Sequence, residues 1–470
     1  MTASLGVSVT TAVDGAVRPT VVILGAGFGG LQACEALMSE DVDVLLVDRH
    51  NYNTFQPLLY QVATAGLSPG DIAYPVRSYV HRRPKARFHR ASVTGVDLAG
   101  RKVVVEDGEP IGYDYLVIAT GAATNFFGVK GAAEHARAIY TMEDAVAVRD
   151  QSSENLERAA GARLPPSRRL PPTSRLPPRA DISEGVLTVV IVGGGPTGVE
   201  MAGTLAELRG MRLRTLYPEL DPAAARVVLV EQQDRLLSAF DRRLGDYALS
   251  VLEDRGVEVR CGSVVREVTA KEVRLGSGEV IPCGLVVWAA GVGSTPLARS
   301  LGAALDVLAE TAQAPGAPGS STPSRSIPGM EKGRLAVGAD LRLHGCREVF
   351  AVGDVAAARS AGSQAFLPQL AQPAIQEGRH AGRQIARLMA GRETEAFVYK
   401  DKGIMATIGR RAAVAELPLG IRLRGTPAWV AWLGLHIVFL LGARNRVSVI
   451  VNWAWRYLFW RSAPKVIAGS

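Results

Sequence analysis

The amino-acid sequence predicts an α/β fold in which two parallel-sheet domains are followed by a helical region at the C-terminus. Three observations support this prediction. Short apolar runs rich in valine and isoleucine recur along the chain, as in parallel strands that are buried on both faces. Two of these runs lead directly into a glycine-rich turn and then into a helical pattern. Five of the six tryptophans lie between Trp429 and Trp460, in the most apolar part of the 470 residues.

The first domain opens with the apolar run VVIL, from Val21 to Leu24, which continues into the turn GAGFGG. Its glycines Gly25, Gly27 and Gly30 have the spacing G-x-G-x-x-G. In this spacing the first glycine permits a tight turn, the second lets the backbone approach a pyrophosphate, and the third allows helix and strand to pack closely. The N-terminus of the next helix offers free N–H groups to the phosphates. A second strand ends at Asp48, whose carboxylate can bind ribose hydroxyls.

The same pattern recurs in the second domain. The run TVVIV leads into the turn GGGPTG, with Gly193, Gly195 and Gly198 at the same spacing, and a later strand ends at Glu231. An acidic residue at this place binds a 2′-hydroxyl and repels a 2′-phosphate, so the pattern favours NADH over NADPH. The sequence therefore predicts two Rossmann-like dinucleotide-binding domains.

Two further strand ends complete the pattern. The stretch YDYLVIATG places Thr120 and Gly121 after one apolar strand, and REVFAVGD places Asp354 after another. Together with the leading glycine turn, these stretches resemble the two-dinucleotide-binding flavoproteins over residues 20–400. The resemblance implies FAD in the first domain, with Asp354 near the ribityl and phosphate part of the flavin, and NADH in the second.

One region decides which class of flavoprotein the sequence resembles. Disulfide reductases need a redox-active cysteine pair soon after the first domain's second strand, but residues 51–75 contain no cysteine, which excludes a thiol relay. This region is similar to that of the type II NADH:quinone oxidoreductases. Four stretches carry the resemblance: FQPLLYQVATAGL (55–67), GGGPTGVEMAG (193–203), LAQPAIQEG (370–378) and KDKGIMATIGR (400–410). The resemblance implies hydride transfer from NADH to FAD and then transfer of two electrons to a membrane quinone, without proton pumping.

The resemblance also implies roles for five residues. Gln372 and Gln376 are four apart, on one helical face, and would lie beside the quinone; for Gln376, helix packing or support of the flavin ring is an equal alternative. Glu200 would lie near the nicotinamide, or would compensate the helix dipole. Lys402 would lie near the quinone pocket, or would be a surface lysine. Gly291 would border the nicotinamide pocket, or would only end a strand.

Charge and cysteine content exclude other classes. The formal net charge is +8, and residues 417–470 contain seven Lys or Arg and no acidic residue. Because the excess charge lies in the most apolar segment, it favours an anionic membrane surface over nucleic acid. Four scattered cysteines form no CxxC pair or metal spacing. The N-terminus lacks a secretory pattern, so we expect a peripheral enzyme on the cytoplasmic face of the cell membrane.

The apolar C-terminal segment predicts a monotopic membrane-binding region. The stretch 429–443 is almost wholly apolar, but fifteen helical residues reach only about 22 Å, short of the roughly 30 Å hydrocarbon core. In the second stretch, 447–460, Ser448, Asn452 and Arg456 form a polar stripe. This pattern suits a helix lying in the interface, with tryptophans at headgroup depth and arginines toward anionic lipid. A buried dimer interface is the alternative, and His436 is interpreted as a helix-face residue rather than a ligand.

These patterns give the expected division of the chain. The FAD-binding domain is expected at 18–140 and 291–395, the NADH-binding domain at 186–290 and the membrane-associating region at 396–470, with flexible segments at 1–17, 158–184 and 309–329. The family resemblance implies a homodimer. Two other functions are considered. A sulfide:quinone oxidoreductase needs reactive cysteines and no nicotinamide site, so the intact second glycine turn argues against it. A binding module acting through the RLPP repeats at 163–179 would be distinguished by measuring NADH turnover.

Overall fold

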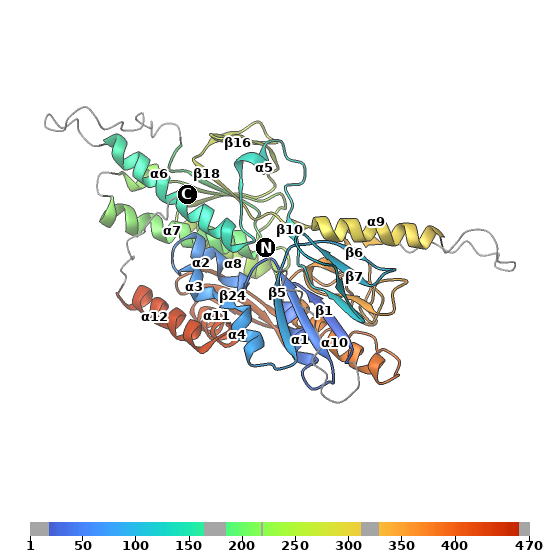
Figure 1. The fold of residues 1–470 in the computed structure, drawn as a ribbon. Coiled ribbons are helices and arrows are strands. Elements are labelled where there is room, and N and C mark those ends of the chain that lie inside the picture. Colours follow the sequence, from blue (N-terminus) through green and yellow to red (C-terminus); the bar gives the residue numbers. More distant parts are fainter. Residues whose placement is uncertain (1–17, 164–184, 218–219, 312–328, 460–470) are drawn as a thin grey trace, which may run out of the picture. The chain divides into compact units, whose positions relative to one another are not determined.

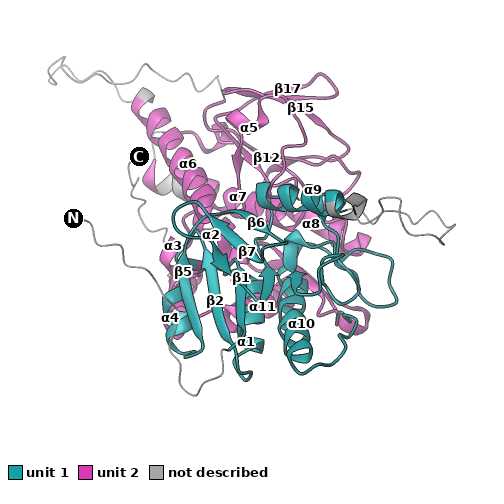
Figure 2. Cartoon of the chain, turned by 45° about the vertical axis from the view of Figure 1, so that its right-hand side comes forward, with its two compact units in different colours: residues 1–52, 75–122, 294–399 teal, residues 53–74, 123–293, 400–470 magenta. Residues whose placement is uncertain are grey.

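The computed structural model describes residues 18–163, 185–217, 220–311 and 329–459. The chain divides into two compact units, each made of segments that are distant in sequence (Figure 2). The first unit comprises residues 1–52, 75–122 and 294–399, and the second comprises 53–74, 123–293 and 400–470. Each unit is built on its own five-stranded sheet.

The sheet of the first unit is parallel and has the strand order β22-β9-β1-β2-β5 (Figure 1). These strands span Val349–Ala351 (β22), Tyr115–Ile118 (β9), Thr20–Leu24 (β1), Asp43–Asp48 (β2) and Ala86–Arg90 (β5). The last four residues of β1 are buried, as the apolar run predicts. The first glycine turn therefore leaves the sheet from its central strand.

Helices α1 (Phe28–Ala36) and α10 (Ala371–Met389) pack against each other in this unit. Their backbones nearly touch, because a Cβ at Gly378 would lie 2.0 Å from the carbonyl oxygen of Gly29. The remaining elements of the unit are α4 (Val76–His81), β6 (Val93–Asp97), β7 (Lys102–Val105), β8 (Ile111–Gly112), α9 (Pro296–Thr311), β20 (Met330–Glu331), β21 (Arg334–Leu335) and the short 3-10 helix η4 (Gly353–Val355).

The second unit repeats the parallel arrangement, with the strand order β11-β18-β12-β13-β14. The strands span Arg137–Ala138 (β11), Leu285–Trp288 (β18), Val189–Val192 (β12), Val227–Val230 (β13) and Val257–Arg260 (β14). Every residue of β13 and β18 is buried, in agreement with their apolar sequences. The second glycine turn leaves this sheet from its central strand, β12.

Helices and a small antiparallel sheet accompany this second sheet. They are α5 (Ala132–His135), α6 (Met142–Arg163), α7 (Pro196–Leu216), α8 (Arg242–Asp254), β15 (Val265–Val268), β16 (Glu272–Leu275) and β17 (Val280–Pro282), and β10 (Ala123–Thr124) pairs with β19 (Val292–Gly293). Helix α6 includes residues 158–163 of the segment expected to be flexible. The rest of that segment, like residues 1–17 and 312–328, lies outside the described residues.

The C-terminal part of the chain also belongs to the second unit. Strands β23 (Ile404–Gly409), β24 (Ala412–Leu417) and β25 (Ile421–Arg424) form an antiparallel sheet that precedes helices α11 (Thr426–Phe439) and α12 (Ala443–Phe459). Short elements of residues 53–74 pack in the same unit, namely α2 (Leu59–Ala63) and α3 (Pro69–Ile72). Among the described residues, no helix combines the length and apolar character that a membrane crossing requires.

Candidate active site

The first glycine turn joins β1 to α1 at the carboxyl end of the first sheet. Gly25 has a φ of +101°, and a Cβ at this residue would lie 2.3 Å from the carbonyl oxygen of Ala119. A Cβ at Gly30 would lie 1.9 Å from the carbonyl oxygen of Gly25. Gly27, the N-cap of α1, has nothing within 4 Å of an added Cβ. The first and third glycines are therefore required by close backbone contact, and the second leaves open space where a phosphate can approach the helix N-terminus.

The second glycine turn has the same geometry. Gly193 has a φ of +111°, and its Cβ would lie 2.6 Å from the carbonyl oxygen of Ala289. A Cβ at Gly198 would lie 1.8 Å from the carbonyl oxygen of Gly193, whereas Gly195, the N-cap of α7, again has nothing within 4 Å. Each unit thus carries one open glycine turn at the edge of the sheet where dinucleotides bind.

A carboxylate at the end of the neighbouring strand holds each glycine turn. Asp48, at the end of β2, accepts the N–H of Ala26 over 2.7 Å. Glu231, which follows β13, accepts the N–H of Gly194. Each carboxylate also accepts the backbone N–H two residues further along its own chain. Both acids therefore lie beside their glycine turns, where the sequence pattern placed a ribose-binding group.

The chain that leaves β9 adds a polar group to the first unit. Gly121 has a φ of +67°, and the hydroxyl of Thr120 is buried without a hydrogen-bond partner in the described part of the chain. A buried polar group without a partner costs about 1–3 kcal/mol, so a bound group that reaches this hydroxyl would gain that interaction. The preceding residue, Ala119, is the one that the turn at Gly25 contacts. Together these residues fit a bound dinucleotide at this edge.

Helix α10 fixes the turn that carries Asp354. The backbone N–H of Gly353, which has a φ of +76°, donates to Glu377 Oε2 over 2.6 Å. Gln369 Nε2 donates to the carbonyl oxygen of Asp354 over 2.9 Å. Burial raises the pKa of Glu377 to about 8, although the N–H of Gly353 acts in the opposite direction. A protonated carboxyl at neutral pH therefore lies at the base of this turn.

The glutamines and the lysine predicted for the quinone site fall in different units. Gln372 and Gln376 lie one turn apart on α10 of the first unit, and both are partly buried. Lys402 is exposed in the chain that leads to β23, in the second unit. The sequence-based roles of these three residues stay predictions.

Glu200 is buried where α7 runs along β23. Its Oε1 accepts the N–H of Thr407 over 3.3 Å. One turn further on, a Cβ at Gly203 would lie 1.9 Å from the carbonyl oxygen of Ile408. Burial raises the pKa of Glu200 to about 8, against the opposing effect of the hydrogen bond from Thr407. The protonated form of this buried carboxyl is therefore favoured at neutral pH.

Aromatic residues of α11 and α12 are buried in the second unit. The ring of Trp432 stacks on that of His436 with a centroid distance of 3.9 Å, and His436 Nδ1 donates to the carbonyl oxygen of Trp432 over 2.7 Å. Burial lowers the pKa of His436 to about 4, so the imidazole is neutral at pH 7. Trp453 Nε1 donates to Gln61 Oε1 over 2.7 Å, and Gln61 Nε2 donates to Tyr60 Oη over 2.8 Å. Two of the five tryptophans in the apolar C-terminal segment thus belong to the protein core.

The polar stripe of α12 faces the protein, which corrects the arrangement expected from the sequence. Ser448 Oγ donates to Asp71 Oδ1 over 2.6 Å, and Asn452 Nδ2 donates to Asp71 Oδ2 over 3.0 Å. The guanidinium of Arg456 lies 4.0 Å from the carboxylate of Glu207. Each polar group of the stripe therefore has a partner in the second unit, and Trp432 and Trp453 are buried in the core instead of exposed for contact with lipid headgroups.

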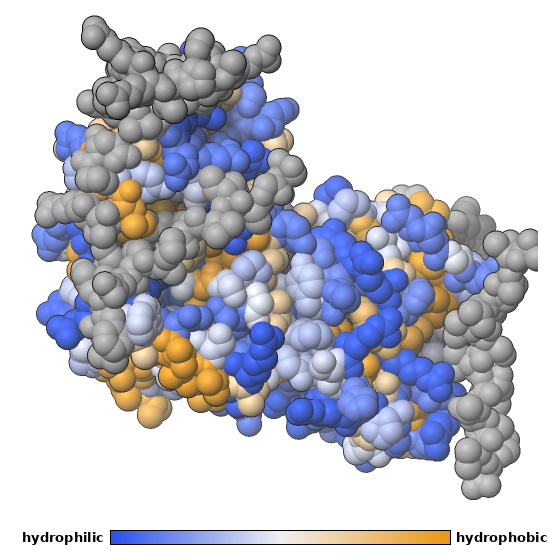
Figure 3. Space-filling model, turned by 60° about the vertical axis from the view of Figure 1, so that its left-hand side comes forward, coloured by the Kyte–Doolittle hydropathy of each residue, from blue (hydrophilic) through white to orange (hydrophobic). Residues whose placement is uncertain are grey.

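The opposite faces of these helices are apolar and exposed. Val438 is 64 % exposed, Val447 60 % and Val451 58 %. The other exposed members of this apolar face are Val430, Leu435, Phe439, Ile450 and Trp455. Figure 3 shows hydrophobic residues gathered at the lower left of the view, at the height of α11 and α12 in Figure 1. The exposed surface of α11 and α12 is therefore apolar, mostly aliphatic with two aromatic side chains, Phe439 and Trp455.

Comparisons with known proteins decide the family. The family model described as pyridine nucleotide-disulphide oxidoreductase matches residues 19–310, and that of the NDH2 C-terminal domain matches residues 402–462. The chain is 34 % identical over 460 residues to the type II NADH:quinone oxidoreductase Ndh of Mycobacterium tuberculosis, covering 96 % of this chain and 90 % of the relative. The chain belongs to the type II NADH:quinone oxidoreductases.

Further members of the type II family agree with this assignment. The Staphylococcus aureus (strain NCTC 8325 / PS 47) type II NADH:quinone oxidoreductase is 28 % identical over 404 residues, covering 84 % of this chain and 89 % of the relative. The structure of NDH2 from Plasmodium falciparum in complex with NADH matches with a TM-score of 0.81 at 20 % identity, over 96 % of this chain and 100 % of that one. At this identity the structural match shows the fold. The predicted α/β fold and the resemblance stated from the sequence are both confirmed.

As a type II NADH:quinone oxidoreductase, the protein is an enzyme that transfers electrons from NADH to quinone without pumping protons. The pyridine nucleotide family that matches residues 19–310 implies binding of a flavin and NAD(H). The residues present fit both groups, since each unit has an open glycine turn with an acid beside it, and Thr120 has an unsatisfied buried hydroxyl.

Sequence reasoning about the family motifs missed three acidic residues. Glu377 follows Gln376 directly and lies on the buried face of α10 with Ala374 and Ala381, so helical periodicity could have placed it. Asp71 completes a capping box with Ser68 at the start of α3, a recognisable pattern, but its partners on α12 lie 377 and 381 residues away. Glu207, which lies opposite Arg456, carries no local signal.

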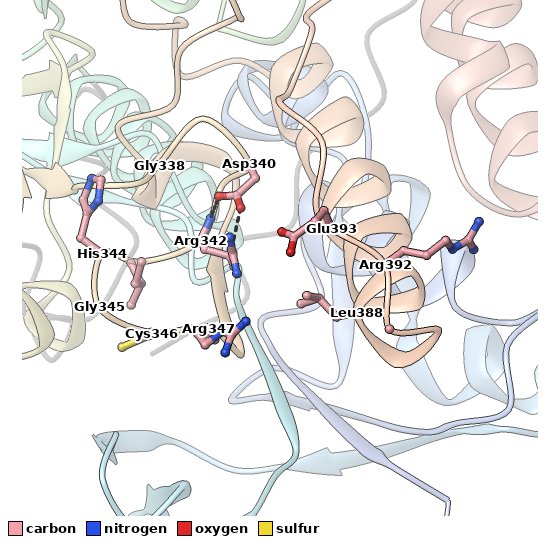
Figure 4. A pocket seen from close by; sticks show the side chains of 12 residues that line it. Gly338, Asp340, Arg342, His344, Gly345, Cys346, Arg347, Leu388, Arg392 and Glu393 are labelled. Atoms are coloured by element: carbon pink, nitrogen blue, oxygen red, sulfur yellow. Dashed lines mark hydrogen bonds and ion pairs between the residues drawn. The ribbon is translucent and has the colours of Figure 1, made fainter.

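A pocket in the first unit stands apart from these predicted site residues of the type II family. It lies between the chain around residues 338–347 and the end of α10, with a volume of about 560 Å³ (Figure 4). Arg342 pairs with Asp340, which also accepts a hydrogen bond from Thr394 Oγ1 over 2.7 Å. None of the predicted site residues lines this pocket, so it has no part in the function proposed below.

Proposed function

We propose that the first unit binds FAD at the turn of Gly25, Gly27 and Gly30, and that the second unit binds NADH at the turn of Gly193, Gly195 and Gly198. The observation that carries this proposal is the shared geometry of the two turns: in each, two glycines are in backbone contact and the third faces open space. Asp48 and Glu231 lie where each would accept hydrogen bonds from a ribose. The negative charge of Glu231 repels a 2′-phosphate and so favours NADH.

The flavin, when bound, accepts a hydride from NADH and supplies the two electrons that reduce the quinone. The chain positions the reactants and controls protons. Glu200 holds a proton at neutral pH in a buried site. We assign Glu200 the role of proton donor or charge stabiliser near the nicotinamide, with Thr407 fixing its carboxyl. Gly291 forms the border of the nicotinamide pocket.

The amides of Gln372 and Gln376 can donate hydrogen bonds to a quinone carbonyl, since both lie on the same face of α10. The same helix fixes the turn of Asp354 through Gly353 and Glu377, so the quinone-side and flavin-side groups of this unit share one rigid element. Asp354 is assigned to the ribityl and phosphate part of the flavin. Thr120 and Gly121 border the flavin, and Lys402 is assigned to the quinone pocket.

The apolar face of α11 and α12 is assigned to the membrane surface. Its exposed aliphatic side chains are flanked by the exposed arginines Arg444 and Arg446, which can interact with anionic headgroups. The bound quinone is a membrane molecule, so this surface would keep the enzyme at its substrate. Attachment to the cytoplasmic face, a homodimeric state and the expected domain boundaries (18–140 with 291–395, 186–290 and 396–470) stay predictions.

Two half-reactions test the assignment of cofactors. The purified protein should show flavin absorption bands, which NADH should bleach without a second substrate. A short-chain soluble quinone should then restore the bands. Extraction and chromatography of the released flavin distinguishes FAD from FMN. A protein that purifies without flavin and cannot be reconstituted, or whose bands do not respond to NADH, would exclude the assignment.

Exposed valines offer a matched test of the membrane surface. Replacing Val438, Val447 and Val451 together by serine should weaken binding to vesicles that contain anionic lipid, because about 0.8 kcal/mol is lost per buried CH₂. The matched control replaces exposed valines elsewhere, Val280 and Val398, by serine. Flavin reduction by NADH should be unchanged in both proteins. Equal vesicle binding by the two variants would show that another surface attaches the enzyme.

The cysteines argue against the sulfide:quinone oxidoreductase alternative. A sulfide:quinone oxidoreductase from Aquifex aeolicus matches this chain with a TM-score of 0.65 at 17 % identity, which shows a shared fold. Cys34 and Cys283 are buried, and burial raises the pKa of each thiol to about 12. Such thiols are poor nucleophiles at neutral pH. Sulfide should therefore not replace NADH as the reductant of the flavin.

A further inference from the structure

An aromatic ring covers Gly291 in the second unit. The side chain of Phe127 is 61 % exposed. Its Cζ and Cε2 atoms lie 3.0 and 3.3 Å from the position that a Cβ at Gly291 would occupy. The ring therefore lies on the bare backbone of Gly291 without entering the core. Because most of this side chain is exposed, burial contributes little to holding the ring over Gly291.

The backbone holds this ring in place at an energetic cost. Phe127 has a φ of +51°, in the left-handed region that bulky residues rarely adopt. Its N–H donates to Asn125 Oδ1 over 2.8 Å, and the carbonyl oxygen of Asn125 accepts the indole N–H of Trp288 over 2.8 Å. The N–H of Asn125 donates to the carbonyl oxygen of Gly291 over 3.2 Å. Trp288 at the end of β18 and Gly291 just after it thus anchor the turn that carries Phe127.

The topology of the sheet shows what would lie over Gly291. The glycine turn follows β12, Glu231 follows β13 on one side of it, and Gly291 follows β18 on the other side. A dinucleotide with its pyrophosphate at the turn and its adenosine ribose at Glu231 must extend its nicotinamide half toward β18. Gly193 contacts Ala289 directly, so Gly291 lies within reach of that half. The ring and the nicotinamide half therefore compete for the same surface.

We propose that Phe127 is a gate over the nicotinamide part of the NADH site, which must swing away from Gly291 before the dinucleotide can bind completely. This inference rests on the proposed NADH site of the second unit. The gate lowers the apparent affinity for dinucleotide, because only the fraction of molecules with an open gate can bind it completely. It also keeps the nicotinamide surface covered when no NADH is present. Phe127 thus controls access of NADH to the site of the known reaction.

Binding of two nucleotides to the holoenzyme tests the gate, with NAD⁺ as a complete dinucleotide and ADP-ribose as one that lacks the nicotinamide. Phe127→Ala and Phe127→Gly should both bind NAD⁺ roughly three- to tenfold more tightly, as expected if the gate is open in about 10–30 % of wild-type molecules. Their affinity for ADP-ribose should not change. The KM for NADH should fall in both variants without a rise in kcat. Equal tightening in the two variants shows that the effect comes from loss of the ring, because only the glycine variant also relieves the strain of the positive φ at residue 127.

Phe126→Leu is the matched control, because the ring of Phe126 packs against Trp288, with a centroid distance of 5.5 Å, instead of covering Gly291. It should lower the melting temperature without tightening NAD⁺ binding. Unchanged or weaker NAD⁺ binding in the Phe127 variants overturns the gate, and so does an equal change for ADP-ribose. If the wild-type enzyme binds neither nucleotide, the proposed NADH site is wrong and the gate falls with it.

Discussion

Asp71 should hold helix α12 onto the second unit. Its carboxylate accepts hydrogen bonds from Ser448 and Asn452 of α12 and from the backbone N–H of Ser68. A hydrogen bond to a charged group contributes about 1.5–3 kcal/mol. In Asp71→Ala, both side chains of α12 lose their acceptor, and part of this loss is offset because a carboxylate is no longer buried. We expect the opening of α12 to become easier by about 2–4 kcal/mol.

Hydrogen–deuterium exchange measures this opening directly. A change of 2–4 kcal/mol corresponds to roughly 30- to 1,000-fold faster exchange of the amides of α12. Asp71→Asn keeps one acceptor oxygen and should give a smaller increase. A double-mutant cycle with Ser448→Ala should show a coupling of about 0.5–3 kcal/mol, because the two residues share a hydrogen bond. Vesicle binding should weaken together with the loss of protection.

The control is Asp221→Ala, which removes another carboxylate from the second unit. Asp221 caps a short 3-10 helix by accepting the N–H of Ala223 over 2.9 Å and has no bond to α12. Its loss should leave exchange in α12 unchanged. If α12 of Asp71→Ala exchanges at the wild-type rate, or if both variants speed exchange equally, then the carboxylate does not hold the helix.

Three further substitutions test the proposed site. Glu200→Gln should remove a pH dependence of stability. The pKa of Glu200 in the folded protein is raised from 4.5 to about 8, so the stabilisation by this carboxyl is complete below pH 4.5 and is lost as the pH rises through 8. Melting curves should therefore show the free energies of unfolding of wild type and variant diverging over this window, toward a difference of about 5 kcal/mol. Glu231→Gln should raise kcat/KM for NADPH relative to NADH by about tenfold, since a like-charge repulsion of about 1–2 kcal/mol is removed; a wild-type preference for NADPH would contradict the assignment. Gln372→Ala should slow quinone reduction more than flavin reduction by NADH, by about 1–3 kcal/mol of activation free energy, in stopped-flow measurements; equal slowing of both steps or loss of flavin would indicate a structural role.

The sequence predicted the parts of the fold that depend on local patterns. The runs before Gly25 and Gly193 are central strands, and the glycine spacing predicted two turns with the same geometry. The acids Asp48 and Glu231 lie beside these turns. These features follow from backbone geometry within one β-α-β segment, which the chain encodes over a few tens of residues.

The orientation of α12 could not be predicted from its own sequence. Periodicity shows that Ser448, Asn452 and Arg456 share a face, but it does not show whether that face meets water, lipid or protein. Their partners Asp71 and Glu207 lie hundreds of residues earlier in the chain. The rule that polar faces point to solvent fails here because the carboxylates of Asp71 and Glu207 pair with the stripe, and the apolar face is left exposed.

Gly203 removes the side chain that would otherwise separate helix α7 from strand β23. Side chains can change rotamer and so absorb a small displacement, whereas two backbones in contact transmit it. Helix α7 begins at the second glycine turn and touches the strand at Ile408, next to Thr407. Because helix and strand meet through their backbones, we expect a displacement of α7 to move β23 with it. Any side chain at residue 203 would meet the backbone of Ile408 and force helix and strand apart, so this direct coupling depends on glycine.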